Sequence, residues 1–330
     1  MGIKIIGTGS YVPERILTNF DLEKMVDTSD EWIRTRTGIE ERHIAADHQS
    51  ASDLAYEACK NAIEMAGAET DDIDMIIVAT VSPDYPFPST ACVLQRKLNI
   101  PQGAMCFDMQ AACSGFIYAI GIADSMIKSH PNMKKALVVG VEKISALTDW
   151  EDRNTCVLFG DGAGAVLLEK RVDENDRGGI LATKLAADGR YSNILQVPAG
   201  GSALPITPEV IAKREQYIRM EGQEVFKQAV TSMVSACKEV LEEAGVSSED
   251  VRWLIPHQAN KRIISAVGKR LNMTEENVYI NVQKYGNTSA ASIGIALDEI
   301  VRKGLIKQGE YILVTAFGAG LTWGATLLKW

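Results

Sequence analysis

Two hydrophobic patterns alternate along the chain. Short, nearly continuous apolar runs rich in Val and Ile occur at 74–80, 136–141 and 311–315. Such runs predict strands buried on both faces, as in the central sheets of α/β proteins. Longer amphipathic patterns at 52–66 and 221–244, each followed by a glycine, predict helices that end in a left-handed turn. The alternation predicts an α/β fold.

The chain also contains an internal repeat. The sequence Ile-Gly-Ile-Ala at 120–123 recurs 173 residues later at 293–296, and the strand at Leu137 has a counterpart 175 residues later at Ile312. Each of these two strands is followed by a glycine-rich stretch and then by an apolar run. These matches occur in the same order along the chain and at nearly the same spacing, which indicates two homologous halves.

The two halves are predicted to meet in the polar stretch 171–179. We therefore expect one half at residues 1–171 and the other at residues 172–330. A further stretch, from Asp188 to about Thr207, is rich in Gly, Pro and Ser and predicts a loop on the surface.

Composition excludes several classes of protein. The chain has 330 residues, 46% of them hydrophobic and 23% charged, which is typical of a globular protein and not of a disordered one. A formal net charge of -9 argues against general nucleic-acid binding, because phosphate contacts need an excess of Lys and Arg. No apolar run approaches the roughly 18 residues of a membrane span. Six cysteines without a CxxC pair, and an N-terminus without a signal-peptide pattern, predict a cytoplasmic protein with reduced thiols.

Cys113 is the strongest candidate for a reactive residue. A strand expected at 104–109, which looks buried, leads through small residues into an almost wholly apolar helix expected at 114–129. Cys113 is thus predicted at a helix N-terminus, where the dipole and free backbone N–H groups favour a thiolate and can stabilise an oxyanion. The alternative is a cysteine of the hydrophobic core, and this interpretation is kept for the other five, which are Cys59, Cys92, Cys106, Cys156 and Cys237.

Two polar residues could act with Cys113. His257 follows the apolar run 253–256, so it is predicted at the C-terminal end of a core strand, where open α/β sheets gather catalytic groups. A hydrogen-bonded core histidine is the alternative. With the offset of 173, Cys113 corresponds to Gly286, which places Asn287 at the matching end of the facing helix. Asn287 as a helix N-cap is the alternative there.

Cys, His and Asn together are compatible with two chemistries. In a cysteine hydrolase, His257 would deprotonate Cys113 and Asn287 would orient His257. In a carbon–carbon condensing enzyme, His257 and Asn287 would both donate hydrogen bonds to a thioester oxygen. The duplicated α/β architecture and the lack of a secretory signal favour condensation. The glycines at 160–164 do not fit a dinucleotide site, and no His or Cys cluster has metal-ligand spacing, so neither a nucleotide cofactor nor a metal is expected.

Four motifs occur in order along the chain, at Thr28–Gly38, Ala111–Phe116, Pro256–Asn260 and Gly286–Ser292. Together they closely resemble the bacterial β-ketoacyl-[acyl carrier protein] synthase III family, and the resemblance extends from about residue 7 to the end of the sequence. It implies the thiolase fold, in which two similar halves enclose buried helices between their sheets in five αβαβα layers. It also implies a homodimer.

The activity implied by this resemblance is the first condensation of type II fatty acid synthesis. An acyl-CoA would acylate Cys113, and malonyl on acyl carrier protein would then lose CO2 and attack the acyl group to give a 3-oxoacyl product. His257 and Asn287 would stabilise the enolate, and the backbone N–H groups of Cys113 and Ala319 would form the other oxyanion hole. No cofactor is implied, since acyl-CoA is a substrate. In one departure, the family's usual Gly-Gly-Gly is here Gly-Ala-Gly around Ala319, and alanine restricts the backbone.

The resemblance also implies residues that bind CoA. Trp32 and Arg153 would sandwich the adenine, Arg36 and Thr28 would contact the phosphates and the nucleotide, and Asn260 would contact the pantetheine. Packing on the surface is the alternative for Trp32 and Arg36.

A basic patch is expected after His257. Several of Lys261, Arg262, Lys269 and Arg270 share one helix face, where they would dock the acidic carrier protein. A merely solvated helix face is the alternative, and Arg262 is the one residue for which docking is preferred.

The acyl pocket is expected to involve Phe317 and Phe87, and Phe87 would reach across the dimer to close the partner's pocket. A degradative thiolase is disfavoured, because it needs a second cysteine in the C-terminal glycine loop and the last cysteine here is Cys237. A relative from specialised metabolism that uses another acyl donor is the closest alternative to the fatty-acid enzyme.

Overall fold

The computed structural model describes residues 2–171 and 178–330. The predicted boundary between the halves, after residue 171, adjoins residues 172–177, which lie outside the described residues.

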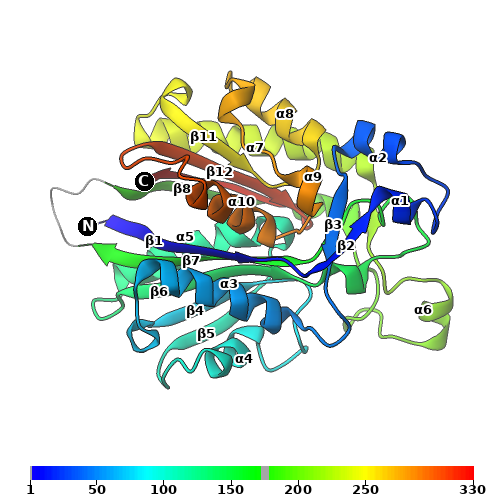
Figure 1. The fold of residues 1–330 in the computed structure, drawn as a ribbon, viewed down its shortest axis with the longest axis horizontal. Coiled ribbons are helices and arrows are strands. Elements are labelled where there is room, and N and C mark those ends of the chain that lie inside the picture. The colour runs from blue at the N-terminus through cyan, green and yellow to red at the C-terminus, as the bar shows by residue number, and fades with distance from the viewer. Residues whose placement is uncertain (1, 172–177) are drawn as a thin grey trace.

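Two central sheets, with helices between them and on their outer faces, make up the fold (Figure 1). Among the described residues, the first sheet has five strands in the order β1 (Gly2–Tyr11), β7 (Gly162–Arg171), β6 (Lys135–Glu142), β4 (Met75–Ala79) and β5 (Met105–Met109). The second sheet has four described strands in the order β8 (Gly179–Ala187), β13 (Thr322–Lys329), β12 (Tyr311–Gly318) and β11 (Val251–Pro256). Two short strand pairs are β2 (Arg15–Thr18) with β3 (Glu41–Ile44) and β9 (Leu195–Gln196) with β10 (Arg219–Met220).

The two sheets repeat one topology. β1 and β8 pair antiparallel with β7 and β13, which in turn pair antiparallel with β6 and β12. β6 and β12 then pair in parallel with β4 and β11. The first sheet continues with β5, parallel to β4. The shared order and strand directions agree with the internal repeat in the sequence.

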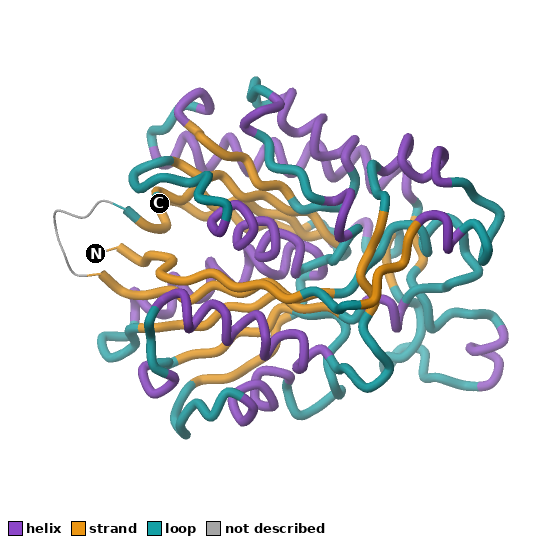
Figure 2. Tube along the Cα trace, in the orientation of Figure 1, coloured by secondary structure: helices purple, strands orange, loops and turns teal. Residues whose placement is uncertain are grey.

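The helices lie in layers around the sheets. α3 (Ala51–Ala66) and α4 (Thr90–Lys97) cover the outer face of the first sheet, α5 (Gly115–Ser129) and α10 (Ala291–Arg302) lie between the sheets, and α7 (Gly222–Ala244) covers the second sheet with α8 (Lys261–Arg270) beside it. Figure 2 shows these helices alternating with the strands, so the layer order is αβαβα, as predicted. The shorter helices are α1 (Asn19–Leu22), α2 (Asp30–Thr37), α6 (Pro208–Ala212) and α9 (Val282–Tyr285).

The apolar runs form the buried strands that their pattern predicts. Every residue of β4 is buried, and β6 and β12 are buried in all but their first residue. The amphipathic helices α3 and α7 end at Gly67 and Gly245, whose φ angles of 58° and 65° are left-handed. Glycine adopts this conformation without a Cβ penalty, which is why it ends these helices.

β5 differs from the prediction of a buried strand at 104–109. It is the last strand of the first sheet, so one of its hydrogen-bonding edges is open. Met105 is accordingly 39% exposed. Cys92, on the neighbouring α4, is also exposed, so the core interpretation of this cysteine is wrong. Met105 and Cys92 both lie in apolar stretches of sequence, but their position at the edge of the sheet leaves their side chains exposed.

Close packing of α10 on the first sheet depends on two glycines. A Cβ at Gly294 would lie 2.7 Å from the backbone carbonyl carbon of Gly164, and a Cβ at Gly164 would lie 2.4 Å from that of Gly294. Real Cβ atoms do not approach this closely, so both positions require glycine. The glycine-rich stretch 160–164 thus has a packing role.

The described residues contain neither a membrane-spanning helix nor a cluster of metal ligands. No helix in this part of the chain combines the length and apolar character needed to cross a bilayer. In the same residues, no group of three or more His, Cys, Asp or Glu side chains could hold a metal ion.

Candidate active site

Cys113 lies in the 3₁₀ turn Ala112–Ser114, between β5 and the start of α5 at Gly115. Ala112 has a positive φ of 45°, which is uncommon for a residue with a Cβ. The turn therefore holds Cys113 in a fixed, tightly bent backbone just before the central helix.

The C-terminal glycine loop packs against this turn. The hydroxyls of Ser114 and Thr322 both donate to the Ala111 carbonyl oxygen, at 2.8 and 2.9 Å. A Cβ at Gly318 would lie 2.7 Å from the Cys113 backbone nitrogen. Glycine at this position lets the second half of the chain approach the backbone of Cys113.

His257 directly follows β11, and only 3% of its surface is exposed. Its backbone N–H donates to the Thr315 carbonyl oxygen at 2.8 Å. The ring Nδ1 lies 2.7 Å from Ser292 Oγ, which also accepts the Gln258 backbone N–H at 3.3 Å. Because Ser292 Oγ accepts that N–H, its own hydroxyl can donate to Nδ1. The proton of the neutral imidazole then lies on Nε2.

The protonation state of His257 follows from its burial. Burial lowers the pKa of His257 to about 3, because an imidazolium would lose its hydration there. The ring is therefore neutral at physiological pH. It can donate a hydrogen bond from Nε2, but it is a poor acceptor for a thiol proton.

Asn287 is held by a backbone bridge between the two halves. Its N–H donates to the Leu158 carbonyl oxygen at 2.8 Å, and its carbonyl oxygen accepts the Gly160 N–H at 3.1 Å. Its side-chain Oδ1 accepts the Ser289 N–H at 2.9 Å. The amide Nδ2, which can only donate, is therefore the end available to a ligand. Helix α10 has Ala290 as its N-cap, so the N-cap alternative for Asn287 is wrong.

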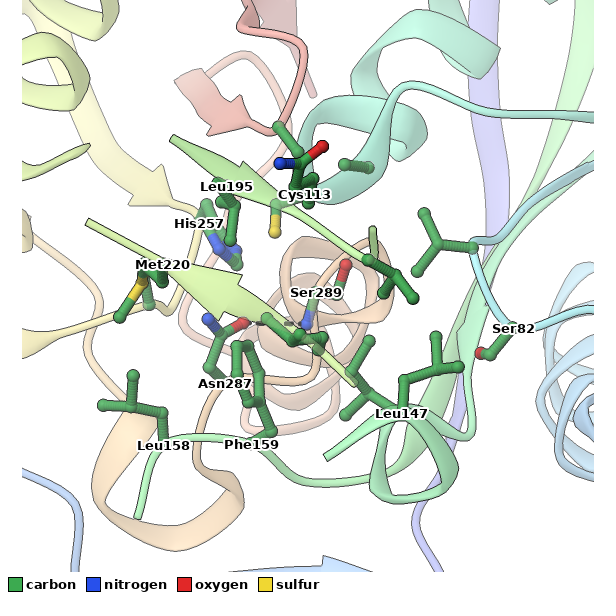
Figure 3. Close-up of a pocket in the computed structure, with 18 of the residues that line it drawn as sticks. Ser82, Cys113, Leu147, Leu158, Phe159, Leu195, Met220, His257, Asn287 and Ser289 are labelled. Carbon is green, nitrogen blue, oxygen red and sulfur yellow. Dashed lines mark hydrogen bonds between the residues drawn. The ribbon is translucent and has the colours of Figure 1, made fainter. Parts of the chain in front are cut away.

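The three side chains meet at one cavity of about 1590 Å³ between the two halves. Figure 3 shows the Cys113 sulfur, the His257 ring and the Asn287 amide around a common space, with Ser289 close to the sulfur. Other expected residues that line this cavity are Trp32, Arg36, Asn260, Arg262, Phe317 and Ala319. The expected residues that do not line it are Thr28, Phe87, Arg153, Lys261, Lys269 and Arg270.

The Cys113 thiol is harder to ionise than its place before a helix suggests. Burial raises the pKa of Cys113 to about 11, although the nearby Ser289 side chain opposes this shift. Desolvation thus outweighs the effects that were expected to favour a thiolate. At neutral pH the sulfur is protonated, so its reaction as a nucleophile requires a proton acceptor.

The geometry disfavours a cysteine hydrolase. In that chemistry Asn287 would orient His257, but the Asn287 oxygen accepts the Ser289 N–H and the His257 Nδ1 is bonded to Ser292. The two side chains instead present two donor groups to the cavity. Two neutral donors on the wall of one cavity suit an oxygen that gains negative charge.

The expected nucleotide residues gather around Trp32 at the cavity mouth. The guanidinium of Arg153 lies 4.5 Å from the centroid of the Trp32 ring, and that of Arg36 lies 5.2 Å from it. Arg153 therefore occupies the space where adenine was expected to stack, and it must move for a base to enter. It also pairs with Asp27 at 3.8 Å. Thr28 Oγ1 is buried and has no hydrogen-bond partner among the described residues.

Asn260 and the basic residues lie on α8. Asn260 is the N-cap: its side chain accepts the Arg262 N–H at 2.8 Å and donates to the Arg36 carbonyl oxygen at 3.1 Å. Asn260 thus joins α8 to α2. The four basic side chains on α8 are exposed, and Arg262 packs over the Phe226 ring at the cavity wall.

The two phenylalanines expected in the acyl pocket have different surroundings. Phe317 is buried and lines the cavity. Phe87 is 86% exposed and does not line the cavity of its own chain. Its loop neighbours Tyr85 and Pro86 do line it.

Sequence reasoning missed three buried side chains around the site. Ser292 bonds the His257 ring, the Ser289 N–H bonds Asn287 Oδ1, and the Glu142 carboxyl accepts the Ser82 hydroxyl at 2.6 Å. Both serines lie within the quoted motif 286–292. The signal for Glu142 was an acidic residue directly after an apolar run.

Comparison with known proteins identifies relatives over the whole chain. The family models of 3-oxoacyl-[acyl-carrier-protein (ACP)] synthase III match residues 107–189 and, for its C-terminal part, residues 241–330. A β-ketoacyl-[acyl-carrier-protein] synthase III of Caldanaerobacter subterraneus subsp. tengcongensis is 57% identical over 326 residues, which are 99% of this chain and 97% of the relative. The β-ketoacyl-[acyl-carrier-protein] synthase III of Aquifex aeolicus is 53% identical over 330 residues, and the match covers 100% of both chains.

Solved structures give the same result. The crystal structure of 3-oxoacyl-[acyl-carrier-protein] synthase III from Aquifex aeolicus superposes with a TM-score of 0.91 at 52% identity, covering 100% of both chains. The enzyme from Pseudomonas aeruginosa gives a TM-score of 0.91 at 40% identity, covering 100% of this chain and 98% of the other. The predicted thiolase fold is therefore confirmed. The chain belongs to the 3-oxoacyl-[acyl-carrier-protein] synthase III family.

Proposed function

We propose that the protein catalyses the initiating condensation of type II fatty acid synthesis. Acyl-CoA transfers its acyl group to Cys113 and releases CoA. Malonyl on acyl carrier protein then loses CO2, and the resulting carbanion attacks the acyl-enzyme to give a 3-oxoacyl thioester on the carrier protein. The observation that carries this proposal is the convergence of Cys113, His257 and Asn287 on one cavity between the halves.

The decarboxylation step uses two neutral donors. His257 Nε2–H and Asn287 Nδ2–H would both bond the thioester oxygen of malonyl, which becomes an enolate oxygen as CO2 departs. The Ser292 and Ser289 contacts that fix the opposite ends of these side chains support the assignment. Removal of one such donor typically costs about 2.7–4 kcal/mol of transition-state stabilisation.

Acyl transfer needs a second oxyanion hole. The backbone N–H groups of Cys113 and Ala319 would bond the oxygen of the tetrahedral intermediate. The close approach of Gly318 to the Cys113 nitrogen supports this pairing, because it brings the two backbones together. Alanine retains the N–H that this role needs.

Both substrates would enter past α2 and α8. Trp32, Arg36, Arg153 and Thr28 would bind the nucleotide of CoA after Arg153 moves off the indole, and Asn260 would contact the pantetheine. The exposed side chains of α8 would attract the acidic carrier protein, and the residues proposed for this are Lys261, Arg262, Lys269 and Arg270.

The working form is a cytoplasmic homodimer that needs no cofactor or metal. The open edge of β5 supports pairing with a second copy, since an apolar edge strand tends to be covered. The exposure of Phe87 supports its proposed reach into the acyl pocket of the partner. The cysteines are free thiols, which suits a reducing compartment.

Variants of the three central residues test the proposed reaction. With Cys113→Ala, no acyl group should add to the intact protein from acyl-CoA, as measured by mass. His257→Ala and Asn287→Ala should still acylate, but each should release CO2 from malonyl carrier protein about 100 to 1000 times more slowly. Loss of acylation with normal decarboxylation in the His257 variant would refute the assignment.

A further inference from the structure

Arg42 is a fully buried arginine to which the proposed function gives no role. It lies in β3, and its guanidinium donates to the carbonyl oxygens of Leu17 and Val157, at 3.1 and 2.8 Å, and to Asn19 Oδ1 at 2.9 Å. All three acceptors are neutral, and the Nε–H has no hydrogen-bond partner among the described residues. A buried charge with an unpaired donor costs free energy, so its position calls for a reason.

The Val157 carbonyl begins the short segment that holds Asn287. Directly after it, the Leu158 carbonyl oxygen accepts the Asn287 N–H at 2.8 Å, and the Gly160 N–H donates to the Asn287 carbonyl oxygen at 3.1 Å. The two segments thus form a parallel bridge between Phe159 and Asn287, and Figure 3 shows these two residues side by side. The backbone position of Asn287 therefore depends on where this segment lies.

The Arg42 side chain also packs against both sides of this bridge. A Cβ at Gly160 would lie 3.0 Å from the Arg42 Cβ, and a Cβ at Gly286 would lie 3.2 Å from the same atom. Glycine at both positions lets the bridge lie directly on β3. Arg42 thus contacts the bridge through its Cβ and holds it through its guanidinium.

The other side of the guanidinium is fixed to the start of α2. Asn19, whose Oδ1 accepts the Arg42 N–H, donates from Nδ2 to the Ile39 carbonyl oxygen at 2.8 Å and to Asp30 Oδ1 at 2.9 Å. Asp30 is the first residue of α2, and Asn19 is itself buried. The guanidinium therefore connects a frame made of β2, α1 and α2 to the segment that begins at Val157.

We propose that Arg42 positions Asn287 for decarboxylation by holding the segment 157–160, to which the Asn287 backbone is bonded. The planar guanidinium suits this role, because its amino groups reach acceptors on different segments in a fixed geometry. Burial lowers the pKa of Arg42 to about 10, so the group stays charged at neutral pH. Charged donors form stronger hydrogen bonds than neutral ones. The Ser289 N–H then orients the amide of a residue whose backbone is already held.

This inference deepens the proposed function and rests on Asn287 as a donor in decarboxylation. Arg42 touches no reacting atom, so it is a positioning residue. Arg42→Met keeps most of the side-chain stem and removes the donors, whereas Arg42→Lys keeps the charge and loses the planar fork. Arg252→Met is the matched control, because Arg252 donates to Asn277 Oδ1 at 2.8 Å and does not line the cavity.

The first measurement compares CO2 release from malonyl carrier protein with acylation of Cys113. In Arg42→Met we expect kcat for CO2 release to fall about 10- to 100-fold, since a misplacement of about 1 Å can cost about 100-fold. KM for the malonyl substrate and the acylation rate should stay within about twofold of wild type, because the weakened bond matters in the transition state of decarboxylation. Arg42→Lys should recover part of kcat, and Arg252→Met should match wild type.

A double-mutant cycle separates positioning from a general loss of stability. If Arg42 acts through Asn287, adding Arg42→Met to Asn287→Ala should slow CO2 release by less than about twofold beyond Asn287→Ala alone. A further loss of about 10- to 100-fold in the double variant would overturn the proposal. An unchanged kcat in Arg42→Met, or equal losses of acylation and CO2 release, would overturn it as well.

Hydrogen exchange tests the same link without any activity. In Arg42→Met the amide hydrogens of Gly160 and Asn287, which bond across the bridge, should exchange about tenfold faster than in wild type, while Arg252→Met leaves them unchanged. Mass spectrometry of peptides that contain these amides measures the rates, and wild-type rates in Arg42→Met would refute the link.

Two provisions keep the test decisive. If Arg42→Met does not fold, Asn19→Ala removes one acceptor of the guanidinium and carries the same measurements, with an expected loss of kcat of about threefold. An unchanged kcat and unchanged exchange in Asn19→Ala would then overturn the proposal. If the wild type releases no CO2, the proposed function fails, and the exchange rates still decide the role of Arg42.

Discussion

At the scale of single residues, the atom that already has a partner determines what a polar side chain offers to a ligand. Asn287 Oδ1 and His257 Nδ1 are bonded within the protein, so Nδ2 and Nε2 remain for the cavity (Figure 3). Both remaining groups are neutral donors. They can stabilise a developing oxyanion without the desolvation cost of a buried charge.

Ser292→Ala tests the control of the His257 tautomer. The variant removes the hydroxyl that bonds Nδ1, so protonation on Nδ1 should compete with the Nε2–H form. We expect CO2 release from malonyl thioester to slow about tenfold, the equivalent of one lost hydrogen bond, while acylation of Cys113 is retained. The control is Ser125→Ala, because that hydroxyl bonds only a helix carbonyl oxygen at 2.9 Å. An unchanged rate in Ser292→Ala would contradict the assignment.

Glu142→Gln should change how stability depends on pH. The pKa of Glu142 is raised in the folded protein from 4.5 to about 7, so its contribution to stability is complete below about pH 4.5 and is lost as pH rises through about 7. Wild type should therefore lose on the order of 3 kcal/mol relative to the variant across this window. His257 titrates in the opposite direction in both proteins and cancels in the difference. Urea denaturation at several pH values measures the effect, and parallel stability curves would disprove it.

At the scale of elements, the site is assembled where pieces of the two halves touch. The turn that carries Cys113 packs on the glycine loop after β12, and the segment before α10 bridges to residues 158–160. α10 in turn rests on β7 through the contact of Gly294 with Gly164. The position of Asn287 thus depends on how closely a helix approaches a sheet.

Gly294→Ala should separate α10 from β7. Alanine favours a helix interior over glycine by about 1 kcal/mol, but overpacking a tight contact costs about 1–3 kcal/mol, so we expect a net loss of stability. CO2 release should fall as well, because Asn287 and Ser289 precede α10. Gly189→Ala is the control, since nothing lies within 4 Å of its added Cβ. Equal denaturation midpoints for the two variants would show that the contact can adjust.

At the scale of the whole molecule, the cavity that Cys113 lines extends to the exposed loop before α4. Tyr85 and Pro86 line the cavity, whereas Phe87, next in sequence, is turned out of it. In the proposed homodimer this loop would lie at the open edge of β5. The length of acyl group that fits would then depend on a residue from the second copy.

Phe87→Ala should widen the range of acyl-CoA substrates toward longer chains, because it removes the side chain that would close the partner's pocket. The measurement is the set of adducts on Cys113 after incubation with acyl-CoAs of increasing length. Phe20→Ala is a matched control, since Phe20 is 62% exposed but lies on α1. Identical adduct profiles for all three proteins, or a monomer at working concentration, would exclude the role of Phe87.

Much of the fold and of the candidate site could be predicted from the chain alone. The alternating patterns predicted β4, β6, β12, α3 and α7, and the repeat predicted two matching sheets. The motifs pointed to Cys113, His257 and Asn287, which do share one cavity. These features succeed because periodicity and local motifs report the burial and the turn geometry of nearby residues.

Other features were decided only by tertiary structure. The strand at β5 is apolar but lies at a sheet edge, Arg153 stacks directly on Trp32, and the thiol of Cys113 resists ionisation. Exposure, stacking and proton affinity all depend on what distant segments bring to a position. The amino-acid sequence by itself determined which elements form and which residues can react. Their protonation states and hydrogen-bond directions arise from desolvation and contacts between the halves, which no local pattern encodes.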